Sequence, residues 1–98
     1  MTRVILSRKV KDDFDRIFDF LFEPAPAHAA PRIEAIISAI DVLTSSPMIG
    51  RPTPEGQREL IISAGANGYL ALYRYDPLAD TIYVLAVRSQ RERDYKQS

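Results

Sequence analysis

The segment VLAVRSQRERDY begins with four apolar residues, Val84–Val87, and continues directly into a cluster of three arginines and a tyrosine. Its candidate functional residues are Arg88, Arg91, Arg93 and Tyr95. Guanidinium groups are planar donors that match phosphate or carboxylate oxygens, and a tyrosine can stack on a base or donate a proton. These residue types predict a surface that binds an anionic target. The alternative interpretation is a solvated chain end whose Glu92 and Asp94 partly neutralise the arginines.

Two further arginines, Arg58 and Arg74, lie in predicted strands. In an antiparallel meander, the start of one strand and the finish of the next lie at the same end of the sheet. We therefore expect Arg58 and Arg74 to lie near each other, and Arg88 to emerge at the opposite end. The sequence leaves open whether the segment after Arg88 folds back over the sheet.

Other kinds of chemistry have little support. The chain has no cysteine, which excludes disulfides, thiolate catalysis and the usual structural zinc sites. The single histidine, His28, lies in an alanine- and proline-rich segment without convergent partners. Asp12, Asp13 and Asp15 each have a basic residue four positions away, which favours a solvated, ion-paired helix face over a metal site. Without a phosphate loop, serine triad or zinc motif, we expect no cofactor and no metal.

Two helices are predicted in the first half of the chain. Arg3–Ser7 has the pattern of a strand that ends at a helix-capping serine. Apolar residues recur every three or four positions over Val10–Phe22, and again over Ile33–Leu43, which predicts two amphipathic helices. The segment EPAPAHAAP between them predicts a break, since a helix tolerates Pro31 only in its first turn.

Three strands are predicted in the second half. They are Arg58–Ser63, Gly68–Tyr75 and Asp80–Val87. AGAN and DPLA are connectors of hairpin length, and TSSPMIGRPTPEG reads as a loop before the first of these strands. Leu70, Leu72 and Arg74 share one face of the middle strand and its tyrosines share the other, but alternation alone does not select the face that the helices cover.

These elements predict an α+β fold with the order β-α-α-β-β-β, in which a helical hairpin packs on a small, largely antiparallel sheet. A chain of 98 residues suits one domain, residues 1–98. Thirteen basic and thirteen acidic side chains give no overall field that favours nucleic acid. The N-terminus MTRVILSRKV resembles neither a signal peptide nor a membrane span, so we expect a soluble, cytoplasmic protein without membrane contact.

Three strings of the second half, GRPTPEGQRELII, GYLALYRYD and IYVLAVRSQRERDY, resemble the RelE/ParE superfamily of bacterial type II toxins, often labelled plasmid stabilisation proteins. The resemblance extends over nearly the whole chain, from VILSRKVKDDFDRIFDFL to Tyr95. It implies a toxin encoded beside a cognate antitoxin that neutralises it, with operator DNA bound only through the antitoxin.

The superfamily has two known activities, which the resemblance alone does not separate. RelE-like members cut messenger RNA on the ribosome, and ParE-like members inhibit DNA gyrase. Metal-free RNA cleavage needs a base, cations for the phosphate charge and an acid. RelE-like enzymes supply lysines and an arginine at positions where this chain has Leu60, Ile62 and Leu70, so of that set only Arg91 and Tyr95 remain.

Within this resemblance, the absence of those cationic residues favours a ParE-like gyrase inhibitor, with Arg88, Arg91, Arg93 and Tyr95 as target-binding residues. One alternative is a RelE-like, metal-independent endoribonuclease that acts on messenger RNA at the ribosome. Its candidate catalytic residues are Arg58, Arg74, Arg91 and Tyr95. A third possibility is an inactive relative that only binds antitoxin, so whether the protein is an enzyme stays open.

Overall fold

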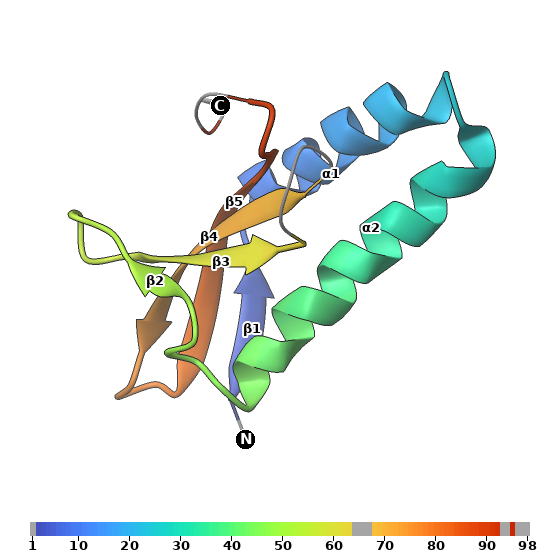
Figure 1. Ribbon diagram of the computed structural model, residues 1–98. Coiled ribbons are helices and arrows are strands. Elements are labelled where there is room, and N and C mark those ends of the chain that lie inside the picture. Colours follow the sequence, from blue (N-terminus) through green and yellow to red (C-terminus); the bar gives the residue numbers. More distant parts are fainter. Residues whose placement is uncertain (1, 64–67, 93–94, 96–98) are drawn as a thin grey trace.

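The computed structural model describes residues 2–63, 68–92 and 95, and within these residues five strands form one sheet (Figure 1). The elements are β1 (Arg3–Leu6), α1 (Arg8–Phe22), α2 (Pro26–Asp41), a 3-10 turn (Val42–Thr44), β2 (Arg51–Pro52), β3 (Arg58–Ile62), β4 (Tyr69–Asp76) and β5 (Thr81–Ser89). The sheet order is β1-β5-β4-β3-β2, parallel between β1 and β5 and antiparallel elsewhere. The predicted α+β fold with a helical hairpin on a largely antiparallel sheet is confirmed.

The junction of β1 and α1 follows the sequence prediction. The backbone N–H of Val10 donates to the Ser7 side-chain oxygen at 3.2 Å, so Ser7 caps the helix. Ser7 also donates its hydroxyl to the Leu85 carbonyl at 3.2 Å. The first turn of α1 is therefore joined by a hydrogen bond to the interior strand β5.

The prediction that the second helix begins near Pro31 was wrong. Helix α2 begins at Pro26, and Pro31 lies inside it. Pro26 occupies the first helical position, where a missing N–H costs nothing, and Ala29 is fully buried in the early part of the helix. Tertiary packing of this kind offsets the hydrogen bond that an internal proline removes.

The two helices form a hairpin whose connected end projects past the sheet (Figure 1). Phe22, expected on the buried stripe of the first helix, is 48% exposed and stacks on Phe18 with ring centroids 5.5 Å apart. At this end the hairpin has no sheet beneath it, and the apolar periodicity continues beyond the surface that could bury it. Val10 and Ile17, nearer the sheet, are buried as expected.

The helices cover the face of β4 that carries its tyrosines. Tyr69, Ala71 and Tyr73 belong to the core cluster, together with Leu60 of β3 and Val84 of β5. Leu72 and Arg74 therefore lie on the opposite, open face of the sheet, because side chains alternate along a strand. An irregularity between Leu72 and Tyr73 shifts the pairing of β4 with β5, so that Leu85 is an extra residue between the paired Val84 and Ala86.

The loop before β3 contains a short strand that the sequence did not predict. Gly50 donates its N–H to the Tyr73 hydroxyl at 2.9 Å, and that hydroxyl donates to the Pro47 carbonyl at 2.8 Å. A Cβ on Gly50 would lie 2.6 Å from the Tyr73 ring, so only glycine allows this approach. The contact places Arg51 of β2 directly opposite Glu59 of β3. The AGAN connector lies outside the described residues.

Candidate functional site

Beyond β5 the structure describes residues up to 92 and Tyr95, and it places Tyr95 on the open face of the sheet. We call residues 89–92 and Tyr95 the C-terminal arm. A turn begins the arm, since Glu92 N–H donates to the Ser89 carbonyl at 3.1 Å and Arg91 N–H donates to the Ser89 hydroxyl at 3.1 Å. The Tyr95 hydroxyl then reaches β3, where it donates to Glu59 at 2.6 Å.

Four side chains meet on the open face, and we call them the open-face cluster. They are Arg51, Glu59, Arg88 and Tyr95. Glu59 is the centre of the cluster: one carboxylate oxygen accepts from Tyr95, and the other accepts from Arg51 at 2.5 and 2.9 Å. The Arg88 guanidinium lies against the Tyr95 ring, 5.1 Å from its centroid, in a cation–π contact.

The electrostatics of this cluster keep Glu59 charged. Burial opposes ionisation of this carboxyl, but hydrogen bonds from Tyr95 and Arg51 and the nearby arginines outweigh it and lower the pKa of Glu59. Burial and the contact with Glu59 both raise the pKa of Tyr95 well above its usual range. At neutral pH the site therefore holds a carboxylate, a protonated phenol and two guanidinium groups.

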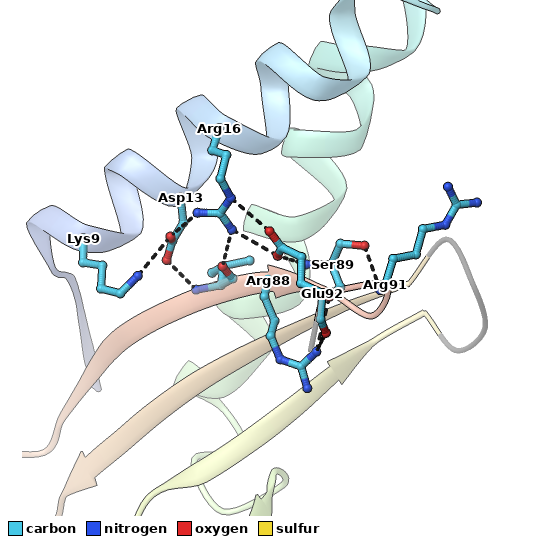
Figure 2. A network of polar contacts seen from close by, with 8 residues as sticks. Lys9, Asp13, Arg16, Arg88, Ser89, Arg91 and Glu92 are labelled. Carbon is cyan, nitrogen blue, oxygen red and sulfur yellow. Dashed lines mark hydrogen bonds and ion pairs between the residues drawn. The ribbon is translucent and has the colours of Figure 1, made fainter. Parts of the chain in front are cut away.

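A second polar cluster joins the arm to helix α1 (Figure 2), and we call it the edge cluster. It consists of Lys9, Asp13, Arg16 and Glu92. Asp13 is 1% exposed and accepts from Arg16 at 2.6 Å and from Lys9 at 3.2 Å. Arg16 donates to both carboxylate oxygens of Glu92, each at 3.1 Å.

The edge cluster supplies hydrogen bonds that a neighbouring strand would otherwise make. Strand β1 pairs with β5 only as far as Val84, so the backbone of β5 beyond that point lacks a strand partner on this side. Asp13 accepts from the Val87 N–H at 2.9 Å, Arg16 donates to the Val87 carbonyl at 3.4 Å, and Glu92 accepts from the Ser89 N–H at 2.9 Å. The exposed edge of β5 is thereby satisfied by side chains.

This arrangement corrects the prediction for the acidic helix face. The spacing predicts a solvated Asp13, but this residue is buried. Its carboxylate accepts hydrogen bonds from the Val87 N–H of β5 as well as from Lys9. The expected Lys9–Asp13 pair does form, at 3.2 Å. Arg16 pairs with Asp13 and Glu92, whereas the sequence spacing had suggested Asp12.

The structure brings together only some of the residues that the sequence proposed. Arg88 and Tyr95 meet in the open-face cluster. Arg91 is exposed, and Figure 2 shows its guanidinium pointing away from Arg88. Arg93 lies outside the described residues.

The expected proximity of Arg58 and Arg74 was wrong as regards their side chains. Both residues lie at the same end of the sheet. Arg58 is paired with Tyr73 and shares its face, so Arg74, the next residue along β4, points to the opposite face. Arg58 donates to the Gly50 carbonyl at 2.7 Å, and Arg74 stacks on the Tyr83 ring at 4.7 Å. Both guanidinium groups therefore have structural contacts.

Sequence reasoning missed Glu59 and Arg51. Glu59 lies in RELII, where its alternation with apolar residues gives only the weak signal of an outward-facing side chain. Arg51 lies in TSSPMIGRPTPEG, whose composition predicts a loop, and its register opposite Glu59 depends on the Tyr73–Gly50 contact. A strand prediction for the residues around Arg51 would have paired the two opposite charges.

The described residues offer no alternative site of another kind. Among them, no group of three histidine, aspartate or glutamate side chains could hold a metal ion, and no helix is long and apolar enough to cross a membrane. His28 is exposed and lines a shallow depression on α2 with Pro31 and Arg32. The open-face cluster, with the arm that forms part of it, is therefore the candidate site.

Comparison of the sequence with protein families and relatives gives consistent matches. The model of the ParE toxin of type II toxin–antitoxin system, parDE, matches residues 4–94. Toxin RelE3 of Caulobacter vibrioides is 31% identical over 93 residues, which cover 95% of this chain and 99% of that protein. Toxin RelE1 of the same organism is 32% identical over 84 residues, which cover 86% of this chain and 88% of that protein.

Solved structures share the fold. The chromosomal ParDE toxin–antitoxin system from P. aeruginosa includes a chain that matches with a TM-score of 0.76 at 22% identity, over 91% of this chain and 96% of that chain. The toxin–antitoxin complex RelBE2 from Mycobacterium tuberculosis includes one that matches with a TM-score of 0.60 at 22% identity, over 91% and 98%. At this identity the two likenesses concern the arrangement of helices and strands.

Proposed function

Because the chain belongs to the RelE/ParE superfamily of type II toxins and matches its ParE toxin family, we propose that it is a ParE-like toxin that inhibits DNA gyrase in the cytoplasm. We propose further that a cognate antitoxin neutralises it. The solved structures with the same fold come from toxin–antitoxin systems, which supports such a partner.

The observation that favours gyrase inhibition over RNA cleavage is the carboxylate at the centre of the open-face cluster. Cleavage of a phosphodiester builds negative charge on the phosphate, and an active site stabilises it with uncompensated cations. Glu59 already pairs with Arg51, and its lowered pKa keeps it anionic. A phosphate placed beside Arg88 and Tyr95 would meet this negative charge, which opposes its binding.

Tyr95 is also poorly suited to act as a general acid or base. A general acid or base works best when its pKa lies near the working pH. The pKa of Tyr95 is raised by burial and by Glu59, and its proton is held in the 2.6 Å hydrogen bond to that carboxylate. A protein that acts by binding needs no such proton transfer, and the Tyr95–Glu59 contact can then serve to hold the arm in place.

The RelE-like alternative has its own support. The two relatives with matches along most of this chain carry the RelE name. Glu59 is also a carboxylate that could accept a proton from a ribose hydroxyl, if Tyr95 moved away from it. Among the residues that the structure describes, Arg88 Nε is buried without a hydrogen-bond partner, and such a movement could offer that donor to a phosphate oxygen.

Expression from a tightly controlled promoter separates the two activities. Labelled thymidine incorporation is expected to fall within minutes, before labelled methionine incorporation, and the purified protein is expected to inhibit gyrase supercoiling. An immediate fall in methionine incorporation would contradict the proposal and favour the ribonuclease. No effect on either would favour a relative that only binds antitoxin.

Glu59→Gln sharpens the test, with Glu55→Gln as a matched control because Glu55 is exposed in the turn before β3. A gyrase inhibitor should retain most of its activity in both variants. If Glu59 were a general base, Glu59→Gln would lower ribosome-dependent RNA cleavage by about 100-fold or more. The control would leave cleavage unchanged.

A further inference from the structure

The C-terminal arm is held at two places that lie far apart in the sequence. At its beginning, Glu92 is bound by Arg16 of α1, 76 residues away. At its end, Tyr95 is bound by Glu59 of β3, 36 residues away. Fixing a chain segment costs on the order of 1–2 kcal/mol per residue in backbone entropy, so an ordered arm depends on anchors of this kind.

Glu92 is the point through which the first anchor acts. Its two carboxylate oxygens accept from Arg16 in a bidentate pair, and one of them also accepts from the Ser89 N–H at 2.9 Å. Its backbone carbonyl accepts from the Arg88 guanidinium. The same residue therefore fixes the turn of the arm and the side chain of Arg88, against which Tyr95 stacks.

Arg16 is itself held rigidly before it meets Glu92. One guanidinium nitrogen donates to the buried Asp13 at 2.6 Å, and another reaches the Val87 carbonyl at 3.4 Å. Burial alone would lower the pKa of Arg16, but its hydrogen bonds to Asp13 and Glu92 raise it, so the cation persists. A planar guanidinium fixed in this way presents Glu92 with a bidentate partner at little further entropic cost.

From these contacts we infer that Arg16 and Glu92 are positioning residues, which hold the C-terminal arm in the conformation that meets the target. The inference rests on the proposed function in one respect, the use of the arm for target binding. Neither residue needs to touch the target. Arg16 acts through Glu92, and Glu92 acts through Arg88 and Tyr95.

Loss of the Arg16–Glu92 pair lowers the fraction of molecules whose arm has the conformation that binds the target. Apparent affinity for a target falls in proportion to that fraction. We expect Glu92→Gln to raise the protein concentration needed for half-maximal gyrase inhibition by about tenfold, with full inhibition still reached at saturation. Asp19→Asn is the matched control, since it removes one negative charge from an exposed position of α1.

Tyr95 provides a second readout that is independent of any target. With tyrosine labelled at the ring carbon that carries the hydroxyl, NMR reports ionisation of each phenol. At about half a pH unit above the usual tyrosine pKa of ~10, Tyr95 of the wild type should stay protonated. In Glu92→Gln it should be partly ionised, because the detached arm no longer brings it to Glu59; Tyr95→Phe assigns the signal.

A double-mutant cycle tests whether the two residues act through each other. Arg16→Gln and Glu92→Gln are each expected to shift the Tyr95 signal and inhibition, and the double variant should be no worse than either single variant. Arg16→Lys replaces Arg16→Gln if the latter unfolds, as judged by thermal unfolding. Additive effects, or a Tyr95 signal unchanged in Glu92→Gln, would overturn the inference.

The two readouts separate this inference from the proposed function. If the wild type does not inhibit gyrase while Tyr95 responds to Glu92→Gln, the anchor is supported and the gyrase proposal fails. If the wild type inhibits gyrase and Tyr95 responds, but inhibition is unaffected, the arm does not contact the target and the inference is wrong.

Discussion

The edge cluster and the open-face cluster both contain arginines and carboxylates, yet they satisfy different partners. Asp13, Arg16 and Glu92 bind backbone groups of β5 as well as one another. Glu59 and Tyr95, in contrast, bind side chains, and Arg51 is 59% exposed. A cluster that completes the backbone hydrogen bonding of a sheet is bound to the fold, whereas one whose side chains bind each other can be rearranged at small cost.

The largest effect should come from the buried acid of the edge cluster. Asp13→Ala leaves the buried Val87 N–H without its acceptor and removes one of the carboxylates that pair with Arg16, and we expect it to lower the free energy of unfolding by about 3 kcal/mol. Urea unfolding measures the loss. Asp12→Ala, at an exposed position of the same helix, should change it by less than about 0.5 kcal/mol. Equal effects of the two substitutions would remove the distinction between the clusters.

A smaller effect is expected from the open-face tyrosine. Tyr95→Phe removes one hydrogen bond to a carboxylate and should cost about 1.5 kcal/mol at neutral pH. The raised pKa of Tyr95 adds a pH signature: the stability it gives is present below its ordinary pKa of 10.0 and is lost as pH rises toward the folded-state value. Unfolding midpoints should thus fall more steeply above pH 10 in the wild type than in Tyr95→Phe. Parallel curves would show that Tyr95 does not contact Glu59 in solution.

The smallest effect should come from the charge of Glu59. Glu59→Gln keeps the shape of the side chain, and since Arg51 is largely exposed we expect a loss of only about 0.5 kcal/mol at neutral pH. A lowered pKa means that this stability is present above the ordinary value of 4.5 and is lost as pH falls through the folded-state value. The difference between wild type and variant should therefore shrink toward about pH 3. A difference that grew on acidification would mean that the fold raises the pKa of Glu59 instead of lowering it.

Periodicity predicted the fold because the elements follow their local patterns. Strand β3 keeps its alternation and α1 keeps its apolar stripe near the sheet, so the order of the elements and the packing of helices on a sheet could be predicted from the sequence. The start of α2 could not, because its early part is stabilised by the burial of Ala29, a tertiary effect. Phe22 broke the pattern for the opposite reason, since no sheet lies beneath that end of the hairpin.

The candidate site was predictable only for the residues of the C-terminal segment. Arg88 and Tyr95 stood out by type, and the fold brings them together. Glu59 joins them because Tyr95 lies against β3, and no local signal in the sequence specifies that contact. Sequence spacing was also insufficient for Asp13. It predicted the pair with Lys9, but the burial of Asp13 depends on its hydrogen bond to the unpaired edge of β5.

The parallel pairing of β1 with β5 bears on when the protein can fold as it is made. Arg3 pairs with Thr81, so the strand that leaves the ribosome first must wait for the last strand of the sheet. Contacts of such long sequence separation form slowly and leave apolar strands exposed in the meantime. The helical hairpin can assemble during synthesis. The complete five-stranded sheet, which carries the arm, forms only after β5 has emerged from the ribosome. A nascent chain that stops short of β5 would lack the complete fold, so any activity must wait until β5 has been synthesised.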